Sequence, residues 1–415
     1  MRKYGVFFTV IILLFFLSTK LSWGEAPHSG FSIANPTFSL LYLNERADHS
    51  PILLYNNDGI DFTEGVNTRM STTLFGKYRW FEVMLKPQFL VTKEKTEETI
   101  QEGFLRLTLT GLNIDLGKES LWWGPGHHGG LFLTNNAKPF PMIRVFNPNP
   151  ILLPSVFRYL GPFQFDIFLS RLESNRAIPK PYFQGTRFSF KPFSILDIGL
   201  TRTIMMGGEG RPGLSPSRFF DIWFGENKET HADELSNSLA GVDFRLTLPE
   251  MQFYGEGGGE DEAGGYPSKW AFLVGAYFPK GKNPLSDMRI EYADISDPSW
   301  YVHGLYQSGY TYKGNVLGHH VGGAGKDFYL EKGLVRSNHI NAHIHLHYEE
   351  RGISIKPIAE RHYQIGTDWT FSSILVMIPW QMKFDFAIDW VRNAGHNPHA
   401  HQENSITRLT IVGQI

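Results

Sequence analysis

The chain has 415 residues and a formal net charge of −2 at pH 7, so charge alone gives it no general attraction for nucleic acid. It contains no cysteine, which excludes both a disulfide framework and a cysteine-linked lipid anchor. Charged residues make up 19% of the sequence and aromatic residues 14%, whereas soluble domains usually carry about 25% charged residues. This balance suits strands that place every second side chain in lipid and the others in an aqueous lumen.

Residues 1–24 are predicted to be a signal peptide. Two basic residues precede the apolar run Tyr4–Leu17, and small residues lie before the expected cleavage point at Gly24–Glu25. The run is shorter than the ~20 residues that a membrane-spanning helix needs, although an uncleaved anchor is the alternative. We therefore expect residues 25–415 to be exported as one domain.

Apolar and polar residues alternate along much of the mature chain, as they do in half-buried strands. The segment Trp380–Trp390 has mostly apolar residues at even positions, with Lys383, Asp385 and Asp389 between them, and Ala240–Leu248 has a similar pattern. The polar face needs water, which is bulk solvent around a soluble sandwich but an enclosed lumen in a barrel. Aromatic residues at strand ends are typical of membrane interfaces and favour the barrel.

We therefore predict an all-β protein, a transmembrane antiparallel β-barrel of about 16–18 strands in contact with outer-membrane lipid. A short helix is expected after an N-cap at Ser215, with Pro216 at the first helical position and an end at Gly225. Because this helix is apolar nearly all round, we expect it to be buried as a short helical plug element. Long segments rich in glycine and proline are predicted to be loops: 205–217, 254–268 and 310–332.

The most unusual stretch is Leu121–Gly130, with the sequence LWWGPGHHGG, followed by Asn135 and Asn136. Its glycines and proline prevent a simple strand or helix. A pyranose ring offers an apolar face to an indole and hydroxyl groups to polar side chains, so this stretch could bind a sugar. The alternative is that the two tryptophans pack inside the barrel or lie at the membrane interface.

This stretch resembles the signature of the capsule assembly family named after Wzi, an outer-membrane lectin for surface polysaccharide. Further segments resemble the same family in the same order: 207–213, 240–243 leading to 260–262, and 309–314 followed by 318–322. The resemblance implies a barrel of about 18 strands, with a helical element at its periplasmic end. It also implies a non-enzymatic role, in which exported polysaccharide is bound and kept at the cell surface.

The candidate polysaccharide-binding residues are Trp122, Trp123, His127, His128, Asn135, Asn136, Glu209, Arg211 and Asp261. No catalytic residue and no cofactor is predicted. The acidic residues Glu256, Glu260, Asp261 and Glu262 lie among glycines, so we expect a solvated loop, with direct or calcium-assisted sugar contact as the alternative. The G-x-G-x-x-G pattern at Gly208–Gly213 lacks the βαβ unit that a dinucleotide site needs.

His343, His345 and His347 occupy alternate positions and therefore point to one face of a strand. Residues two apart on a strand are separated by ~6.8 Å, which lets two imidazoles share a zinc ion. A polar row facing the lumen explains the same alternation. We therefore predict no metal, and these three histidines are the candidates if one is bound.

Together these patterns predict an outer-membrane, lectin-like protein that attaches or organises capsular or exported polysaccharide, with no nucleic-acid partner. The alternative is a porin-like channel for oligosaccharides or other small solutes. A third possibility is a membrane-embedded hydrolase that uses Glu209 or Asp261. Electrical conductance across a planar bilayer separates the first two hypotheses, because a plugged lectin passes little current.

Overall fold

The computed structural model of the chain describes residues 29–44, 54–224, 236–263, 266–281, 287–337, 339–375 and 378–413. Within these ranges, the side chains of residues 29, 261–263, 266–268, 373–375 and 378 are not described. The predicted signal peptide, residues 1–24, and the predicted helix stop at Gly225 lie outside the described residues.

Strands dominate the described chain. Those of the main sheet are β1 (Ser29–Asn44), β2 (Gly65–Tyr78), β3 (Phe81–Val91), β4 (Thr96–Leu109), β5 (Leu112–Glu119), β6 (Phe140–Phe146), β7 (Ile151–Leu152), β8 (Pro162–Arg171), β9 (Tyr182–Phe193), β10 (Leu196–Met206), β11 (Ser236–Thr247), β12 (Gln252–Ala263), β13 (Tyr266–Phe278), β14 (Met288–Ile295), β17 (Gly325–Arg336), β18 (Ile340–Arg351), β19 (Glu360–Leu375), β20 (Ile378–Arg392) and β21 (His401–Gly413). A separate hairpin is formed by β15 (Thr311–Tyr312) and β16 (Asn315–Val316).

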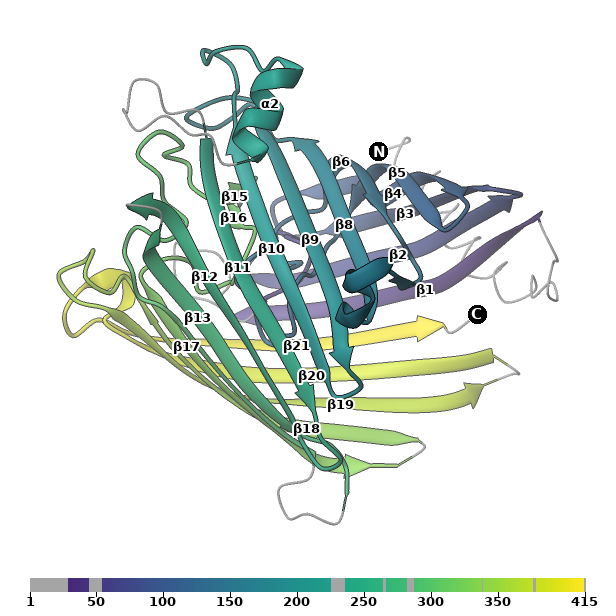
Figure 1. Cartoon of the computed structure of the whole chain (residues 1–415). Helices are drawn as coiled ribbons and strands as arrows, with labels where there is room; N and C mark the ends of the chain where they lie inside the picture. Colours follow the sequence, from purple (N-terminus) through teal and green to yellow (C-terminus); the bar gives the residue numbers. More distant parts are fainter. Residues whose placement is uncertain are drawn as a thin grey trace.

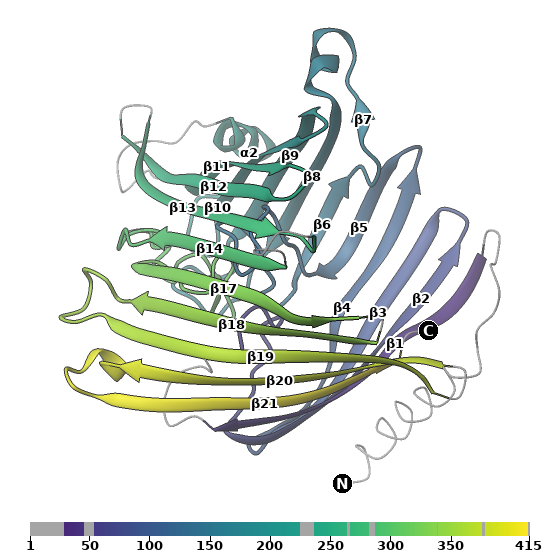
Figure 2. The ribbon, with the colours of Figure 1, turned by 90° about the horizontal axis from the view of Figure 1, so that it is seen from below.

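The main sheet closes on itself into a barrel, because β1 pairs antiparallel with β2 on one side and with β21 on the other (Figures 1 and 2). The pairing follows chain order, and β14 pairs with β17 across the β15–β16 hairpin. The two-residue strand β7 and the strand β6 both pair with β8, so they form one interrupted strand. Of the 19 strands in the described sheet, 18 remain when β6 and β7 count as one. The predicted antiparallel barrel of about 16–18 strands is therefore confirmed.

Successive side chains of a wall strand point alternately out of the barrel and into the lumen. On β11, Val242 and Phe244 point outward and are 51% and 43% exposed, whereas Asp243 between them is 5% exposed. Inside the barrel, Asp243 accepts two hydrogen bonds from Arg187 of β9, at 2.6 and 2.9 Å. The alternation in the sequence thus separates an apolar outer surface, which suits lipid, from a lumen of paired charges.

The two ends of the barrel differ in the length of their connections. At one end, which we call the turn end, short turns join neighbouring strands, such as residues 79–80 between β2 and β3. The opposite end, the loop end, carries long connections, including residues 120–139 between β5 and β6 and 296–324 between β14 and β17. In outer-membrane barrels the turns face the periplasm and the long loops face outward. We assign the two ends of this barrel in the same way.

The predicted helix forms as α2 (Pro216–Trp223), and the Ser215 hydroxyl accepts a hydrogen bond from the Arg218 backbone N–H at 3.2 Å. It does not plug the barrel. Ile222 packs against Ile204 and Met206, which lie on the outer face of β10, and the Trp223 indole donates to the Thr186 hydroxyl on the outer face of β9. Figure 1 shows α2 at the rim of the barrel, beside the end of β10.

The position of α2 also differs from what the resemblance implied, because β10 and β11 are joined at the loop end and not at the periplasmic end. The only helical element that the described residues contain at the turn end is a short 3₁₀ turn, η2 (Ser155–Leu160), between β7 and β8. The helix therefore buries only one face: Phe220 is 51% exposed and Ile222 is 2% exposed. On the buried side, Arg202 of the wall donates to the Trp223 carbonyl at 2.7 Å. None of the helices that the structure describes is long and apolar enough to cross a membrane.

Two predicted loops are wrong in part. Most of 254–268 belongs to the hairpin of β12 and β13, and the second half of 310–332 contains the start of β17 at Gly325. Gly257, Gly258 and Gly259 misled the prediction, because glycine usually weakens a strand. Here Gly258 admits a ring: a Cβ atom at this position would lie 2.8 Å from the Phe132 ring.

Candidate functional site

Three connections fold from the loop end into the lumen, and together we call them the plug: residues 54–64, 120–139 and 296–324. The plug contains the largest side chains of the core, several of which are almost completely buried: Leu131, Phe132, Leu133, Trp300, Tyr306 and Tyr310. They pack against lumen-facing residues of the wall, among them Phe183 of β9 and Leu273 of β13. Figure 2 shows these connections inside the ring of strands. Packed side chains therefore occupy the lumen where a porin would have its channel.

A buried carboxylate holds the most unusual stretch of the sequence in place. Glu291 of β14 accepts hydrogen bonds from the backbone N–H groups of His127, His128 and Gly129, at 2.8, 2.9 and 3.1 Å. It also accepts one from the Tyr254 hydroxyl at 2.8 Å. Hydrogen bonds to a charged acceptor are the strong ones, so this carboxylate fixes the turn around the two histidines.

A second carboxylate, that of Glu256, binds backbone N–H groups on either side of the segment that Glu291 holds. Glu256 of β12 accepts from the backbone N–H groups of Gly126 and Leu131, at 3.1 and 2.8 Å. Glu260, also on β12, accepts from the backbone N–H of Tyr301 at 2.8 Å. The expectation of a solvated acidic loop is thus wrong for Glu256 and Glu260, which are buried and anchor the plug. The side chains of Asp261 and Glu262 lie outside the described residues.

The glycines of the LWWGPGHHGG stretch are required by close contacts. A Cβ atom on Gly129 would lie 2.2 Å from the His319 ring. Gly124 has a φ of +113°, which L side chains rarely adopt, and a Cβ there would lie 2.3 Å from the Glu256 carboxylate. This composition follows from close packing within the plug, at His319, and between plug and wall, at Glu256.

The two adjacent tryptophans have different surroundings. Trp123 is 3% exposed, packs against Phe168, and donates its indole N–H to Asp166 at 3.1 Å. Trp122 is only partly buried, and its indole N–H donates to the Gly126 carbonyl at 3.0 Å. Trp123 is therefore part of the core, and of the two only Trp122 offers a surface to a ligand.

Trp122 borders a cavity of about 470 Å³, a size typical of ligand pockets. The cavity is lined by Trp122, Gly124, Pro125, Gly126, His127, Arg245, Gln252, Tyr254 and Arg289. The wall residues among them lie near the turn end of their strands, so we call it the turn-side cavity. Its aromatic ring, its hydroxyl and amide groups, and its two guanidinium groups suit an acidic saccharide.

A neighbouring cavity of about 290 Å³ shares Arg289 with the first and extends the same lumen space along the wall. Its lining is charged: Asp287, Glu331, Arg336 and Lys383 lie around it. Arg289 lies over the Tyr277 ring, with its guanidinium carbon 4.3 Å from the ring centre. Below the plug, the lumen is therefore lined by cations and by carboxylates.

The loop end has a smaller depression, which we call the lysine groove. It is lined by Ile60, Asp61, Gln88, Leu90, Glu97, Thr99, Gln101, Lys118, Lys138, Pro139 and Lys313. Lys138 forms an ion pair with Asp61 at 2.8 Å. Lys118 and Lys313 have no ion-pair partner in the part of the chain that the structure describes. The groove therefore presents uncompensated positive charge to the outside.

The remaining candidates do not gather around Trp122. Asn136 donates to the Val316 carbonyl at 3.1 Å and links two segments of the plug, and Asn135 accepts a backbone hydrogen bond from Asp58. Glu209 forms an ion pair with Lys180 at 2.6 Å on the exterior of the loop end. Arg211 lies on the same β10–β11 connection and borders a small pocket with Arg218 and Ile222, whereas Trp122 lies in the β5–β6 connection. Asp261 lies on β12, but its side chain is outside the described residues.

The three histidines of β18 face the lumen as predicted, but they do not share one site. His343 bonds to Asp368 at 2.9 Å, and His345 lies 4.0 Å from the same carboxylate. His347 instead meets His128 of the plug, with 3.2 Å between their Nε2 atoms.

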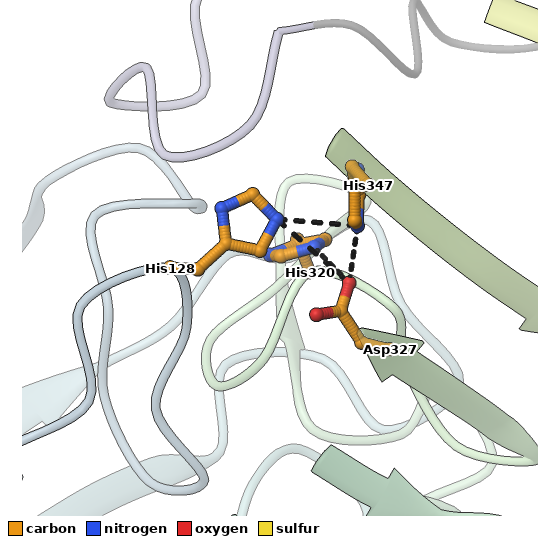
Figure 3. Close-up of side chains that lie close together, drawn as sticks. All are labelled: His128, His320, Asp327 and His347. Atoms are coloured by element: carbon orange, nitrogen blue, oxygen red, sulfur yellow. Dashed lines mark hydrogen bonds and ion pairs between the residues drawn. The ribbon is translucent and has the colours of Figure 1, made fainter. Parts of the chain in front are cut away.

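His128 and His347 belong to a buried cluster that also includes His320 and Asp327 (Figure 3). Burial lowers the pKa of His128 well below its usual 6.5, so that imidazole is neutral at neutral pH. Sequence reasoning missed His320 and Asp327 as partners, because 192 or more residues separate either of them from His128, and no local pattern shows that contact.

The comparisons with known proteins agree with the architecture. The family model of the capsule assembly protein Wzi matches residues 43–402. A curated relative from Klebsiella pneumoniae, an uncharacterized 55.8 kDa protein in the cps region, is 36% identical over 170 residues. That alignment covers 39% of this chain and 33% of the relative, so it spans a third of the relative's length.

Among solved structures, the Escherichia coli protein Wzi is similar to this chain with a TM-score of 0.70 and 20% identity, over 91% of this chain and 84% of that one. It is described as an outer-membrane protein involved in group 1 capsule assembly and as a carbohydrate-binding β-barrel. Pseudomonas aeruginosa OprD is similar with a TM-score of 0.54 and 8% identity, over 94% and 95% of the two chains. At these identities the similarities concern the fold.

Proposed function

The chain belongs to the capsule assembly protein Wzi family, and we propose that it binds an acidic capsular or exported polysaccharide and keeps it attached to the cell surface. As a closed barrel of this family, the chain is an outer-membrane protein. The proposed role is binding and not catalysis. The carbohydrate-binding barrel of similar fold supports this proposal.

The plug is the observation that carries the proposal. A channel for solutes needs a continuous aqueous path, but packed side chains such as Phe132, Trp300 and Tyr310 occupy the lumen between the two ends. The carboxylates of Glu256 and Glu291 fix the plug to the wall. A barrel that is closed in this way is suited to holding a ligand at one end, and less suited to passing it through.

We place the surface contact at the lysine groove, because a polysaccharide outside the cell meets the loop end. Lys118, Lys138 and Lys313 supply positive charge there, and the partly buried Thr99 supplies a hydroxyl group. Attraction between exposed charges is screened by salt, so this binding should weaken as the ionic strength rises.

The turn-side cavity is a second candidate contact. The partly buried ring of Trp122 lies beside Arg245 and Arg289, so an acidic sugar could stack on the indole and pair with a guanidinium. This contact faces the periplasm and is separated from the lysine groove by the plug. Substitutions at the two ends therefore report on different contacts.

The test is binding of purified, detergent-solubilised barrel to the acidic capsular polysaccharide of the cell that makes the protein. Replacing Lys118 and Lys313 together with alanine should weaken binding at least about fivefold at low salt. Lys77→Ala is the matched control, because Lys77 is an exposed lysine at the turn end and is paired with Glu82 at 2.7 Å. Trp122→Ala tests the turn-side cavity separately.

Three outcomes distinguish the parts of the proposal. No measurable binding by the wild-type barrel contradicts the function itself. Full affinity in the double lysine variant, with loss of affinity in Trp122→Ala, moves the contact to the turn end. A large steady conductance of the wild-type barrel in a planar bilayer contradicts a closed lumen and supports the porin-like alternative.

A further inference from the structure

Four side chains from separate parts of the chain point their ligand atoms at one another inside the barrel. They are His128 and His320 of the plug, Asp327 of β17 and His347 of β18, and one ligand atom from each lies within 4.8 Å of all the others. Figure 3 shows the three imidazole rings arranged around the Asp327 carboxylate. Such convergence of nitrogen and carboxylate oxygen is typical of a transition-metal site.

The imidazole nitrogens of this cluster have more close polar neighbours than their hydrogens can serve as hydrogen-bond donors. His347 Nε2 lies 2.5 Å from Asp327 Oδ2, 3.4 Å from Glu349 Oε1 and 3.2 Å from His128 Nε2. An imidazole nitrogen carries at most one hydrogen, so it can donate to only one of the three. His320 Nε2 likewise faces two carboxylate oxygens, at 3.1 Å from Asp327 and 3.0 Å from Glu349.

The buried negative charge around the cluster also favours a bound cation. Asp327 and Glu349 are both almost completely buried, and burying carboxylates is costly unless positive charge accompanies them. Arg351 donates to Glu349 at 2.8 Å and compensates one of the two. Asp327 has no arginine or lysine partner in the described residues, and its Oδ1 atom has no hydrogen-bond partner there.

The surroundings would hold ligands in fixed orientations. The Tyr329 ring stacks on His128, with ring centres 4.0 Å apart and planes inclined by 8°. The Tyr55 ring lies 4.1 Å from His320, and its hydroxyl accepts a hydrogen bond from Gln364. Metal sites in proteins use such neighbours to orient the imidazoles and to limit access of water.

We propose that His128, His320, His347 and Asp327 bind a divalent transition-metal ion, foremost Zn²⁺, in a buried tetrahedral site. With metal–ligand distances of about 2.0–2.1 Å, the ligand atoms of a tetrahedral zinc site lie about 3.3 Å apart. The His128–His347 and His320–Asp327 distances, 3.2 and 3.1 Å, already match that spacing. Four protein ligands leave no open position, so the ion is structural.

The position of the site defines what the ion does. His128 lies in the β5–β6 connection and His320 in the β14–β17 connection, so each comes from a different part of the plug. Asp327 and His347 lie on adjacent wall strands. One ion therefore ties both long connections of the plug to the wall, and its loss should loosen the plug while the strand pairing of the wall remains.

The test measures metal content and its effect on stability in the full barrel in detergent. The barrel is stripped with EDTA, incubated with Zn²⁺ and freed of excess ion by gel filtration. We expect about one zinc ion per chain by elemental analysis, and Zn²⁺ should raise the thermal unfolding temperature. Co²⁺ in place of Zn²⁺ should give the visible absorption of a tetrahedral complex.

Two substitutions of proposed ligands test the site, and two substitutions of neighbouring histidines are the controls. His347→Ala and Asp327→Asn should each weaken zinc binding at least about tenfold, while His343→Ala and His345→Ala on the same strand should leave it unchanged. Heat modifiability on a gel verifies that each variant forms a barrel. If a variant fails this check, His320→Gln replaces it.

Two results would overturn the proposal. One is a stripped wild-type barrel that takes up no zinc and gains no thermal stability from it. The other is zinc binding that is lost as readily in His343→Ala as in His347→Ala, which would place the ion nearer the turn end of β18, beside Asp368.

Discussion

Trp123 donates its indole N–H to the carboxylate of Asp166 at 3.1 Å, and this bond joins the plug to the barrel wall. Asp166 also accepts two hydrogen bonds from Arg144, both at 2.8 Å. The indole thus completes a partly buried network in which one carboxylate accepts hydrogen bonds from a wall strand and from a plug segment. A tryptophan that was a candidate for stacking on sugar is instead a structural link.

Replacing Trp123 should destabilise the barrel without changing its affinity for polysaccharide. Truncation of a large buried ring usually costs roughly 3–5 kcal/mol, so Trp123→Ala should unfold at clearly lower denaturant concentration. Trp122→Ala should change the unfolding midpoint much less, because that ring is only partly buried. Unfolding in urea followed by gel mobility checks this, and equal losses in the two variants would contradict the assignment.

Removing the charge of Glu291 should loosen the plug. In Glu291→Gln the amide oxygen can still accept from one pair of donors, either His128 and Gly129 or His127 and Tyr254. The amide N–H₂ then faces the N–H donor or donors of the other pair, and the remaining hydrogen bonds lose their charged acceptor. Each such bond is worth roughly 1.5–3 kcal/mol. We expect faster cleavage of residues 120–139 by an added protease and transient current steps in a planar bilayer. Glu82→Gln, which affects a carboxylate near the turn end, should show neither.

The plug should respond to pH through Asp58. Burial raises the pKa of this carboxyl above its usual 3.8. A raised folded-state pKa makes the carboxyl stabilising below its unfolded pKa, and that contribution is lost as the pH rises through the folded pKa. Asp58→Asn should therefore raise the stability at pH 7 and have little effect near pH 3. The amide can still accept from Ser120, and asparagine tolerates the φ of +60°.

Asp61 gives the control with the opposite sign. Burial alone would raise its pKa, but Lys138 and Lys95 outweigh burial and hold the pKa below the usual value. Its contribution is present above the unfolded pKa and is lost as the pH falls, so Asp61→Asn should lower the stability at pH 7. Thermal unfolding of both variants at pH 3 and pH 7 checks the two signs, and equal shifts at both pH values would contradict the argument.

The outer position of α2 can be tested by chemical labelling, because the chain has no cysteine of its own. Phe224 is 77% exposed and Ile222 is 2% exposed. In intact cells, a membrane-impermeant maleimide should label Phe224→Cys rapidly. Ile222→Cys should react only after unfolding. Protection of both positions in intact cells would instead place the helix inside the lumen or at the periplasmic end.

The barrel was predictable because its wall obeys a local rule. The alternation around Asp243 identified which side chains point outward, and the Ser215-Pro216 pair marked the start of α2. Both signals arise from residues within a few positions of one another. The wrong loop at 254–268 shows the limit of such signals, because glycine usually weakens a strand, whereas Gly258 there leaves room for the Phe132 ring.

The interior was less predictable because it is made of contacts between distant segments. The sequence identified His128 and His347 as notable residues, but not that they meet each other, 219 positions apart. It placed Glu256 and Glu260 in solvent, since a carboxylate among glycines carries no sign of its distant backbone partners. Those partners lie 125 and 130 residues from Glu256 and 41 residues from Glu260. The lysine groove likewise combines distant residues: Lys118 lies on β5, Lys138 between β5 and β6, and Lys313 between β15 and β16.

The seam between β1 and β21 has a consequence for biogenesis. Leu40 pairs with Leu409, so the cylinder cannot close until segments 369 positions apart have met. Native contacts of such long separation form slowly. During that time the outward apolar residues have neither a finished cylinder nor a lipid environment, and unpaired strand edges favour aggregation. Transit across the periplasm should therefore depend on a chaperone that keeps the unfolded chain soluble. The pairing of β1 with β21 should take place only within the bilayer.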